Sequence, residues 1–407
     1  MNTQLLIKQH STVSGTIHHL PSSKSLSNRA LLINAMMGGR GKLENLSEAN
    51  DTRLMTELLH TPGDVINVED AGTVMRFLTA YYAITGQAKV ITGTARMQKR
   101  PIGELVEALR LLGCTIEYGA EPGYPPLNLK GFTGQQSDHL RIRGDISSQF
   151  ISALMMVAPS LPKGLTLQLT GKIASRPYLE MTATLMKHFG VSVTLGSDTV
   201  RIPEGSYQGS TYRVEPDWSA ASYWFSFAAL AESADILLPH VESSSLQGDR
   251  VIVEIMSQLG VRASFGKDGL RLQGGGHRVD NLTFDFTGCP DLAQTVLPCC
   301  AALGVKGVFT GLESLRLKET DRILALQNEL AKVGSRLEEN QGTWTLTPGS
   351  LPRSTPLTIH TYEDHRMAMG FAPLATCCPV VIENPSVVNK SYPGFWDDLQ
   401  ATGFTVN

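Results

Sequence analysis

The chain has 407 residues, of which 42% are hydrophobic and 18% are charged, and its formal net charge is −3. This length is greater than one ordinary hydrophobic core needs, so it favours two domains, and the composition excludes a disordered chain. The nearly neutral charge gives no sequence-wide attraction to nucleic acid or to an anionic membrane surface. We therefore expect a globular protein whose charged sites are local.

The N-terminus and the cysteines bear on location. The first residues, MNTQLLIKQHSTVSG, have a polar start and a very short apolar patch, which is not typical of a signal peptide. No run of about 18 uninterrupted apolar residues predicts a transmembrane helix. The six cysteines form two adjacent pairs and two singles, which fit neither a disulfide framework nor CxxC metal spacing. We expect reduced, buried thiols and hence a cytoplasmic location.

Helical runs that end in a glycine and lead into short alternating segments recur along the chain. A glycine at that place closes the last helical turn in a left-handed conformation, and the alternation after it predicts strand pairs. The clearest cases have these glycines: Gly113, Gly190, Gly260, Gly334 and Gly403. An earlier case, ELLHTPGDVINV, has Gly63 and lacks the usual hairpin. The interval exceeds that of common solenoid repeats and predicts six copies of one α/β (α+β) unit.

Serine, lysine and arginine gather where predicted helices begin. In chain order these helices lie in 21–36, 69–82, 144–159, 174–190, 289–300 and 362–371. Free N–H groups and the positive end of the helix dipole make such starts natural anion sites. Plain N-capping explains any single serine equally well. The recurrence of Lys and Arg favours a shared anion pocket.

The segment KETDR at 318–322 places Glu319 between Lys318 and Arg322 at the predicted start of a further helix, which ends at Gly334. In a helix, Lys318 and Arg322 would share a face and Glu319 would neighbour Arg322. A cation pair beside a carboxylate suits a reaction that binds an anion and moves a proton. A solvated, salt-bridged helix start is the alternative.

Several common motifs are missing from the sequence. There is no GxxxxGK[ST] loop and no strand-linked GxGxxG, so nucleotide binding is not indicated. HExxH and GxSxG are absent as well, so neither a metal site nor a serine nucleophile is indicated.

The blocks PSSKSLSNRA, DAGTVMR, ARMQKRPIGELVEALR, SSQF, SRPY, KETDR and DHRMAM occur in this order. Together they resemble the signature blocks of the 5-enolpyruvylshikimate-3-phosphate synthase (3-phosphoshikimate 1-carboxyvinyltransferase) family, over nearly the whole chain. The resemblance implies the two-domain enolpyruvyl transferase fold, with three inverse α/β units per domain and chain crossovers near Pro21 and Pro216. Residues 1–21 plus 217–407 would form the phosphoenolpyruvate-side domain with the catalytic acids, and 22–216 the shikimate 3-phosphate side. The active site would lie in the interdomain cleft, and a trimmed hairpin is expected around 61–67.

The implied reaction transfers the enolpyruvyl group of phosphoenolpyruvate to the 5-hydroxyl of shikimate 3-phosphate, in the pathway to chorismate and the aromatic amino acids. The resemblance implies a monomer with small-molecule substrates, without nucleic acid, membrane, cofactor or metal. By matched motif, shikimate 3-phosphate would contact Lys24, Ser25, Arg29, Ser147, Ser148, Gln149, Ser175, Tyr178, Asp291 and Lys318. Phosphoenolpyruvate would contact Lys24, Gly72, Arg96, Gln149, Arg322, Arg366 and Lys390. Asp291 would accept a hydrogen bond or proton from the attacking hydroxyl, while Glu319, aided by Lys24 or Lys318, would move a proton at the methylene carbon.

Two positions depart from the family pattern, and two other functions compete. Asp70 and Ser314 stand where the family usually has Asn, and Asp70 is a candidate partner for Arg76. The first competitor is the sister transferase that acts on UDP-N-acetylglucosamine, which typically carries a cysteine before its RP dipeptide, where GTARMQKRP has none. The second is a non-catalytic anion-binding homologue, which would not need the proton-handling acids.

Overall fold

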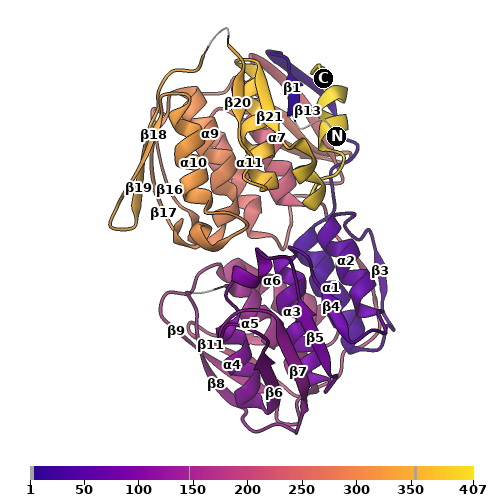
Figure 1. The fold of residues 1–407 in the computed structure, drawn as a ribbon. Helices are drawn as coiled ribbons and strands as arrows, with labels where there is room; N and C mark the ends of the chain where they lie inside the picture. The colour runs from indigo at the N-terminus through magenta and orange to yellow at the C-terminus, as the bar shows by residue number, and fades with distance from the viewer. Residues whose placement is uncertain (1–3, 146, 353–354) are drawn as a thin grey trace. The chain divides into compact units, whose positions relative to one another are not determined.

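The computed structural model describes residues 4–145, 147–352 and 355–407. The chain divides into two compact units: unit 1 comprises Met1–Ser22 and Glu215–Asn407, and unit 2 comprises Ser23–Val214. The two crossing segments are paired, because Ser22 bridges Pro216 and the Asp217 N–H donates to the Pro21 carbonyl at 2.8 Å. Each unit is built from helices and small sheets (Figure 1). Among the described residues, no helix is long and apolar enough to cross a lipid bilayer.

Unit 2 contains three sheets and six α-helices in its described residues. The helices are α1 (Lys24–Met36), α2 (Asn50–Leu59), α3 (Gly72–Ile84), α4 (Gly103–Leu112), α5 (Ser148–Val157) and α6 (Arg176–His188). The strands are β3 (Lys42–Glu44), β4 (Val65–Asn67), β5 (Lys89–Thr92), β6 (Cys114–Tyr118), β7 (Leu127–Phe132), β8 (His139–Arg143), β9 (Leu165–Thr170), β10 (Thr194–Leu195), β11 (Thr199–Ile202) and β12 (Thr211–Arg213). The sheet orders are β4-β5-β7-β6, β10-β11-β9-β8 and β12-β3.

Unit 1 likewise contains three sheets and six α-helices in its described residues. The helices are α7 (Trp218–Leu230), α8 (Ile252–Gln258), α9 (Ala293–Leu303), α10 (Arg322–Ala331), α11 (His365–Phe371) and α12 (Phe395–Ala401). The strands are β1 (Gln4–Ile7), β2 (Thr12–Thr16), β13 (Ser233–Pro239), β14 (Arg262–Gly266), β15 (Gly269–Gln273), β16 (Asn281–Asp285), β17 (Lys306–Thr310), β18 (Arg336–Asn340), β19 (Thr343–Thr347), β20 (Leu357–Ile359) and β21 (Val380–Glu383). The sheet orders are β14-β15-β13-β2, β16-β17-β19-β18 and β1-β21-β20.

The predicted sixfold repeat is confirmed by the strand pairing. In four sheets a parallel pair is followed by an antiparallel hairpin, as in β8 with β9 and then β11 with β10. A fifth sheet follows the same plan, with β20 and β21 parallel, β1 antiparallel, and Val406 bridging Ile7 at the edge. The sixth keeps only the parallel pair of β12 and β3.

The hairpin expected in trimmed form around 61–67 is absent, which corrects the prediction. After α2 the chain passes directly into β4, which pairs in parallel with β5 of the next sheet. Gly63 is also not left-handed, whereas Gly113, Gly190, Gly260 and Gly403 have φ of +109°, +91°, +90° and +106°. Without a hairpin to enter, the chain has no need for a left-handed residue after α2.

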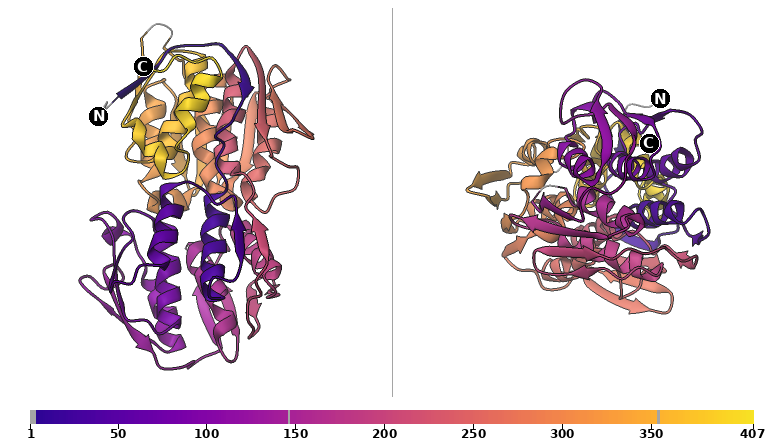
Figure 2. Two further views of the ribbon diagram at one scale, coloured as in Figure 1. Left: turned by 90° about the vertical axis from the view of Figure 1, so that its right-hand side faces the viewer. Right: turned by 90° about the horizontal axis from the view of Figure 1, so that it is seen from below.

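Each unit buries one helix from each of its repeats. These inner helices are α1, α3 and α5 in unit 2 and α7, α9 and α11 in unit 1, and in each unit they pack against one another. Every residue of α11 is buried, as are Phe150–Val157 of α5. Phe150–Val157 are almost all apolar, which accounts for the burial of α5. In α11 the two polar residues, His365 and Arg366, are at the first turn, and the residues after them are apolar or glycine. Figure 2 shows the inner helices running alongside one another within their units.

Gly370 sets how closely α9 and α11 approach. A Cβ atom at Gly370 would lie 2.0 Å from the backbone carbonyl oxygen of Gln294 in α9. Because that oxygen belongs to a helix backbone and cannot move aside, only glycine allows this packing.

We therefore expect Gly370→Ala to lower the free energy of unfolding by about 1–3 kcal/mol or more, the cost typical of an overpacked core. Urea denaturation followed by circular dichroism measures it. Gly63→Ala is the matched control, since only the Thr61 methyl lies near, at 3.9 Å. Equal stability of Gly370→Ala and wild type would contradict the close approach.

Candidate active site

The predicted helix at KETDR begins later than expected. Asp321 is the N-cap and Arg322 the first residue of α10, whereas Lys318 follows a 3₁₀ turn (Glu313–Leu317) and Glu319 lies in the connection. Lys318 and Arg322 therefore do not share a helix face, which corrects the prediction. The Asp321 side chain accepts from the Leu324 N–H at 3.0 Å, so the cap itself fixes where the helix starts.

Arg322 is the centre of an ion cluster in unit 1, with a side chain only 2% exposed. Its Nε lies 2.7 Å from Asp364 Oδ2, its Nη1 2.8 Å from Asp291 Oδ1, and its Nη2 2.8 Å from Glu319 Oε2. Burial opposes the charge of Arg322, but the carboxylates of Asp364, Glu319 and Asp291 outweigh this effect and raise its pKa above the usual range. The guanidinium is therefore permanently charged and fixed in direction.

Asp291 lies in a 3₁₀ turn (Pro290–Leu292) immediately before α9. Besides Arg322, it contacts Lys318 Nζ at 3.5 Å and Arg366 Nη2 at 2.9 Å. Burial alone would raise the pKa of Asp291, but Arg366, Lys318 and Arg322 together hold it well below its usual range. In this state Asp291 is a firmly ionised hydrogen-bond acceptor.

Arg366 extends the cluster to α7. Its Nη2 also lies 3.3 Å from the Ser219 hydroxyl, and its Nη1 lies 3.5 Å from the Tyr223 hydroxyl. Burial raises the pKa of Tyr223 above its usual range, so this phenol remains neutral. Lys390 ends a 3₁₀ segment (Pro385–Lys390) that packs against α11.

A strained turn positions Asp364 and Arg366. Tyr362 and Glu363 have φ of +52° and +56°, a left-handed conformation that costs about 1–3 kcal/mol per residue. Glu329, on α10 and fully buried, accepts from the Tyr362 hydroxyl at 2.8 Å and from the His360 N–H at 3.2 Å. Its remaining contact is Lys332 Nζ at 2.7 Å. Through these bonds Glu329 stabilises the turn that contains Tyr362 and Glu363. After the turn, Asp364 caps α11, because its side chain accepts a hydrogen bond from the Arg366 N–H at 2.9 Å.

In unit 2, Arg29 is the corresponding buried cation, with 2% exposure. It donates to Thr182 Oγ1 at 2.8 Å, the Ser25 carbonyl at 3.0 Å and Ser152 Oγ at 3.1 Å, and it lies over the Tyr178 ring at 5.7 Å. Among the described residues no carboxylate pairs with it. Burial lowers the pKa of Arg29 to about 10. Arg29 thus carries a charge that the unit itself does not neutralise.

The other predicted residues of unit 2 lie at the starts of its helices. Lys24 opens α1 and pairs with Asp51 of α2 at 3.0 Å. Ser147 caps α5, where its hydroxyl accepts from the Gln149 N–H at 3.3 Å, and Gln149 Nε2 donates to Thr73 Oγ1 of α3 at 3.3 Å. The starts of α3 and α5 therefore meet.

Gly72 is the first residue of α3, and the Arg100 guanidinium packs on it so closely that a Cβ would lie 2.7 Å from Nη1. Arg96 precedes a 3₁₀ turn (Met97–Lys99) in the loop that leads to Arg100. Asp70 accepts a short hydrogen bond from the Thr94 hydroxyl, which ties this loop to the start of α3.

The remaining predicted residues do not act as ordinary caps. Ser148 is the first residue of α5. Ser175 precedes α6 with φ +57° and makes no side-chain capping bond, so capping does not account for this serine. His365, whose role the sequence left open, is buried at 2% with Nδ1 3.7 Å from Asp364 Oδ1.

Some of the polar partners are not evident in the sequence. Asp51, Ser152 and Thr182 contact Lys24 or Arg29 but sit inside ordinary helical patterns. Of these partners, Glu329 could have been noticed in the sequence, because it is a charged residue at a position of α10 that faces the core. No group of three or more His, Cys, Asp or Glu suited to a metal ion occurs in the parts of the chain that the structure describes.

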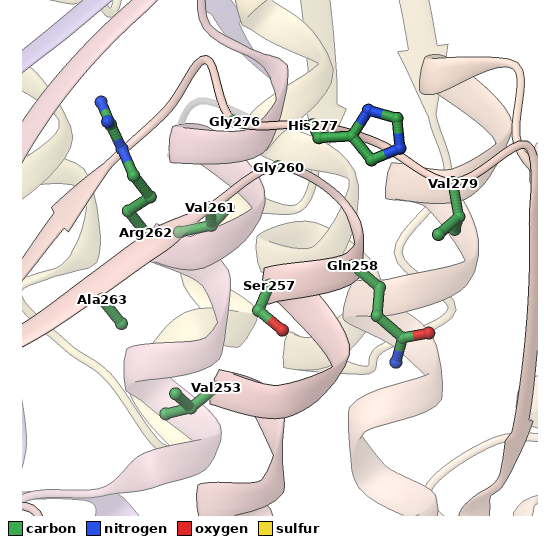
Figure 3. Close-up of a pocket in the computed structure, with 10 residues that line it drawn as sticks. All are labelled: Val253, Ser257, Gln258, Gly260, Val261, Arg262, Ala263, Gly276, His277 and Val279. Atoms are coloured by element: carbon green, nitrogen blue, oxygen red, sulfur yellow. The ribbon is translucent and has the colours of Figure 1, made fainter.

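One hollow on the surface of unit 1 lies apart from these residues (Figure 3). It has a volume of ≈ 520 Å³ and is lined by parts of α8, β14 and the segment 276–279. Its lining is mainly apolar, with Arg262 and His277 at opposite ends. None of the predicted site residues lines it.

Comparison with known proteins identifies the class. The family model described as EPSP synthase (3-phosphoshikimate 1-carboxyvinyltransferase) matches residues 7–70 and 59–399. A 3-phosphoshikimate 1-carboxyvinyltransferase of Bacteroides fragilis is 47% identical over 406 residues, covering 98% of each chain. One of Burkholderia vietnamiensis is 36% identical over 428 residues, covering 96% of this chain and 97% of the relative. The structure of an EPSP synthase from Acinetobacter baumannii has the same fold, with a TM-score of 0.76 at 21% identity over 99% of both chains.

These matches define an enolpyruvyl-transferring enzyme of the two-domain fold. The chain belongs to the EPSP synthase (3-phosphoshikimate 1-carboxyvinyltransferase) family. The predicted fold and the predicted reaction, transfer of the enolpyruvyl group of phosphoenolpyruvate to shikimate 3-phosphate in the shikimate pathway, are confirmed. These relatives are named for shikimate 3-phosphate as the acceptor, which favours this reaction over transfer to UDP-N-acetylglucosamine.

The role of Glu329 in stabilising the turn can be tested by substitution. We expect Glu329→Gln to lower the free energy of unfolding by about 1–3 kcal/mol, because Lys332 loses its counter-ion and the hydrogen bond from the Tyr362 hydroxyl to residue 329 weakens. The sequence motifs assign Arg366 to phosphoenolpyruvate binding, so on that expectation the Michaelis constant for phosphoenolpyruvate should rise when Arg366 loses its fixed position. Urea denaturation and steady-state kinetics measure the two effects. Glu338→Gln, exposed on β18, is the control, and a variant with wild-type values in both assays would exclude this supporting role.

Proposed function

We propose that the chain performs this transfer with the residues that the sequence motifs indicate, and that units 1 and 2 are the two domains of the family. Shikimate 3-phosphate would be bound by Lys24, Ser25, Arg29, Ser147, Ser148, Gln149, Ser175, Tyr178, Asp291 and Lys318. Phosphoenolpyruvate would be bound by Lys24, Gly72, Arg96, Gln149, Arg322, Arg366 and Lys390. A complete active site would then draw on both units.

The observation that carries the proposal is the ionised Asp291 held among Lys318, Arg322 and Arg366. Phosphate and carboxylate groups of the substrates would compete for these cations, since charge-assisted hydrogen bonds to such groups are strong. When substrate anions share these cations, the cations depress the pKa of Asp291 less, and Asp291 becomes a better proton acceptor. The base would therefore become active only when the anionic substrate is present.

The proposed reaction has two steps. In the first, the 5-hydroxyl oxygen bonds to C2 of phosphoenolpyruvate while its proton passes to Asp291, and Glu319 in its protonated form gives its proton to the C3 methylene. In the second, the C2–O bond to phosphate breaks, the proton on Asp291 leaves with the phosphate, and the Glu319 carboxylate takes a proton back from C3, which restores the double bond and both acids. The Glu319 carboxylate is held for this by Arg322 at 2.8 Å. General acid–base transfer of this kind contributes about 10²–10⁴-fold to rate.

The six cysteines are free thiols, and burial raises the pKa of Cys114 to about 12 and that of Cys299 to about 12. Unreactive, reduced thiols support our further proposal of a cytoplasmic location. We also propose, from the resemblance to the family, that the enzyme is a monomer. Size-exclusion chromatography with light scattering tests the second of these.

The reaction itself is tested by phosphate release from phosphoenolpyruvate, with shikimate 3-phosphate or UDP-N-acetylglucosamine as the acceptor. We expect release only with shikimate 3-phosphate. Release with the sugar nucleotide instead, or with neither acceptor, would overturn the assignment.

The role of Glu319 is tested by Glu319→Gln, which keeps the shape of the side chain and removes its proton transfer. We expect turnover to fall by about 10²–10⁴-fold, with calorimetric affinity for shikimate 3-phosphate nearly unchanged. Glu313→Gln, in the preceding 3₁₀ turn, is the matched control. Parallel loss of turnover and of affinity would show a structural role for Glu319.

A further inference from the structure

Asp249 is a buried carboxylate beside the ion cluster that none of the proposed roles uses. It lies in a 3₁₀ turn (Gly248–Val251) and is 4% exposed. Its Oδ2 accepts a short hydrogen bond from the Ser219 hydroxyl, and Ser219 Oγ lies 3.3 Å from Arg366 Nη2. Its other oxygen, Oδ1, has no hydrogen-bond partner among the described residues. A buried carboxylate with one unsatisfied oxygen calls for an explanation.

The surroundings of Asp249 make its charge costly. Burial, and then the negative charge of Asp291, raise the pKa of Asp249 to about 6, which Arg366 and Ser219 only partly oppose. The charged or titratable groups that face it are Asp217 at the cap of α7, Asp291 and Cys289 from the turn before α9, and Arg366 of α11. Its neighbour Arg250 donates to the Ser243 carbonyl instead.

The sign of the stability effect follows from the raised pKa. Between the ordinary value of 3.8 and about 6, the folded protein binds more protons at Asp249 than the unfolded chain does. Stability therefore falls as the pH rises through this window, and the full cost is present above about pH 6. A residue that only supported the fold would not carry such a cost at neutral pH.

Building on the site roles proposed above, we propose that Asp249 is a positioning residue for phosphoenolpyruvate binding, which fixes Arg366 through the Ser219 hydroxyl. A carboxylate only accepts hydrogen bonds, so Asp249 accepts the hydrogen bond of the Ser219 O–H and directs the lone pairs of Ser219 Oγ toward Arg366. Once protonated, Asp249 donates to that same oxygen, so it occupies one of the two lone pairs and no longer orients the Ser219 O–H, and the second lone pair is no longer directed at the guanidinium. Ionised Asp249 thus keeps the Arg366 guanidinium oriented for binding phosphoenolpyruvate.

The test compares Asp249→Asn, Ser219→Ala and the double variant in the phosphate-release assay. We expect each single variant to raise the Michaelis constant for phosphoenolpyruvate by about tenfold or more, as for loss of a hydrogen bond to a charged group. The Michaelis constant for shikimate 3-phosphate should stay unchanged. Because both residues act through one chain of bonds, the double variant should be no worse than either single variant. Asp268→Asn, exposed in the turn between β14 and β15, is the control with wild-type kinetics.

Two pH-dependent measurements separate positioning from a merely structural role. The ratio of wild-type to Asp249→Asn kcat/KM for phosphoenolpyruvate should fall as the pH drops through about 6, and titration of the substrates cancels in this ratio. The midpoint of thermal unfolding of Asp249→Asn should lie above that of the wild type, by more at pH 8 than at pH 5.

An active wild type whose Michaelis constant for phosphoenolpyruvate is unchanged in Asp249→Asn would overturn this inference alone. A lower unfolding midpoint of that variant at pH 8 would also overturn it, since Asp249 would then be structural. A wild type that releases no phosphate would instead contradict the proposed function on which the inference depends.

Discussion

A guanidinium group that is removed from water near the start of a buried helix needs negative charge beside it. Each unit of this enzyme has such a group, Arg29 in unit 2 and Arg322 in unit 1, and each is 2% or less exposed. Arg322 is neutralised within its own unit by Asp291, Glu319 and Asp364. Among the described residues Arg29 is held by neutral partners, chiefly the Ser152 and Thr182 hydroxyls. The two units therefore differ in what an anion must displace in order to pair with the buried guanidinium.

In unit 2 the charge of Arg29 has no carboxylate partner among the described residues, which is why we propose that it serves a ligand. Lowering the pKa of a fully buried Arg29 from 12.5 to about 10 corresponds to a cost of roughly 3 kcal/mol for its charged form. An anion that pairs with Arg29 recovers that cost, and the nearby starts of α1, α3 and α5 add their dipoles. In unit 1 an incoming anion must instead compete with internal carboxylates. That competition is useful to the chemistry, because the displaced carboxylates are the groups proposed to move protons.

The sequence predicted those parts of the molecule that depend on local rules. A glycine after a helix and alternating residues after the glycine require only neighbouring residues, and Gly113, Gly190, Gly260 and Gly403 are all left-handed as expected. The prediction failed where the local pattern was incomplete, at Gly63, because the next segment pairs with another sheet. It also failed at KETDR, where the cap by Asp321 starts α10 after Lys318 and Glu319 rather than before them.

The polar partners of the charged residues could not be predicted from the sequence for a different reason. Thr182 is 153 positions from Arg29 in the sequence, and the hydroxyl of a Thr inside a helix has no pattern of its own. Ser219 meets Arg366 because α7 and α11 pack together, and Asp249 reaches this pair through its bond to Ser219. The motifs therefore indicate which residues carry charge, whereas the packing of the inner helices decides which neutral groups hold them in place.

We propose that the charge of Arg29 serves a ligand and not the stability of the fold. Arg29→Met tests it most directly, because Met fills similar space without a charge. The measurement is urea denaturation of this variant, with and without shikimate 3-phosphate, beside the exposed control Arg53→Met. We predict that the ligand-free variant is no less stable than the wild type and that the stabilisation by shikimate 3-phosphate is lost. A variant that unfolds more easily, yet is still stabilised by shikimate 3-phosphate, would contradict this role of Arg29.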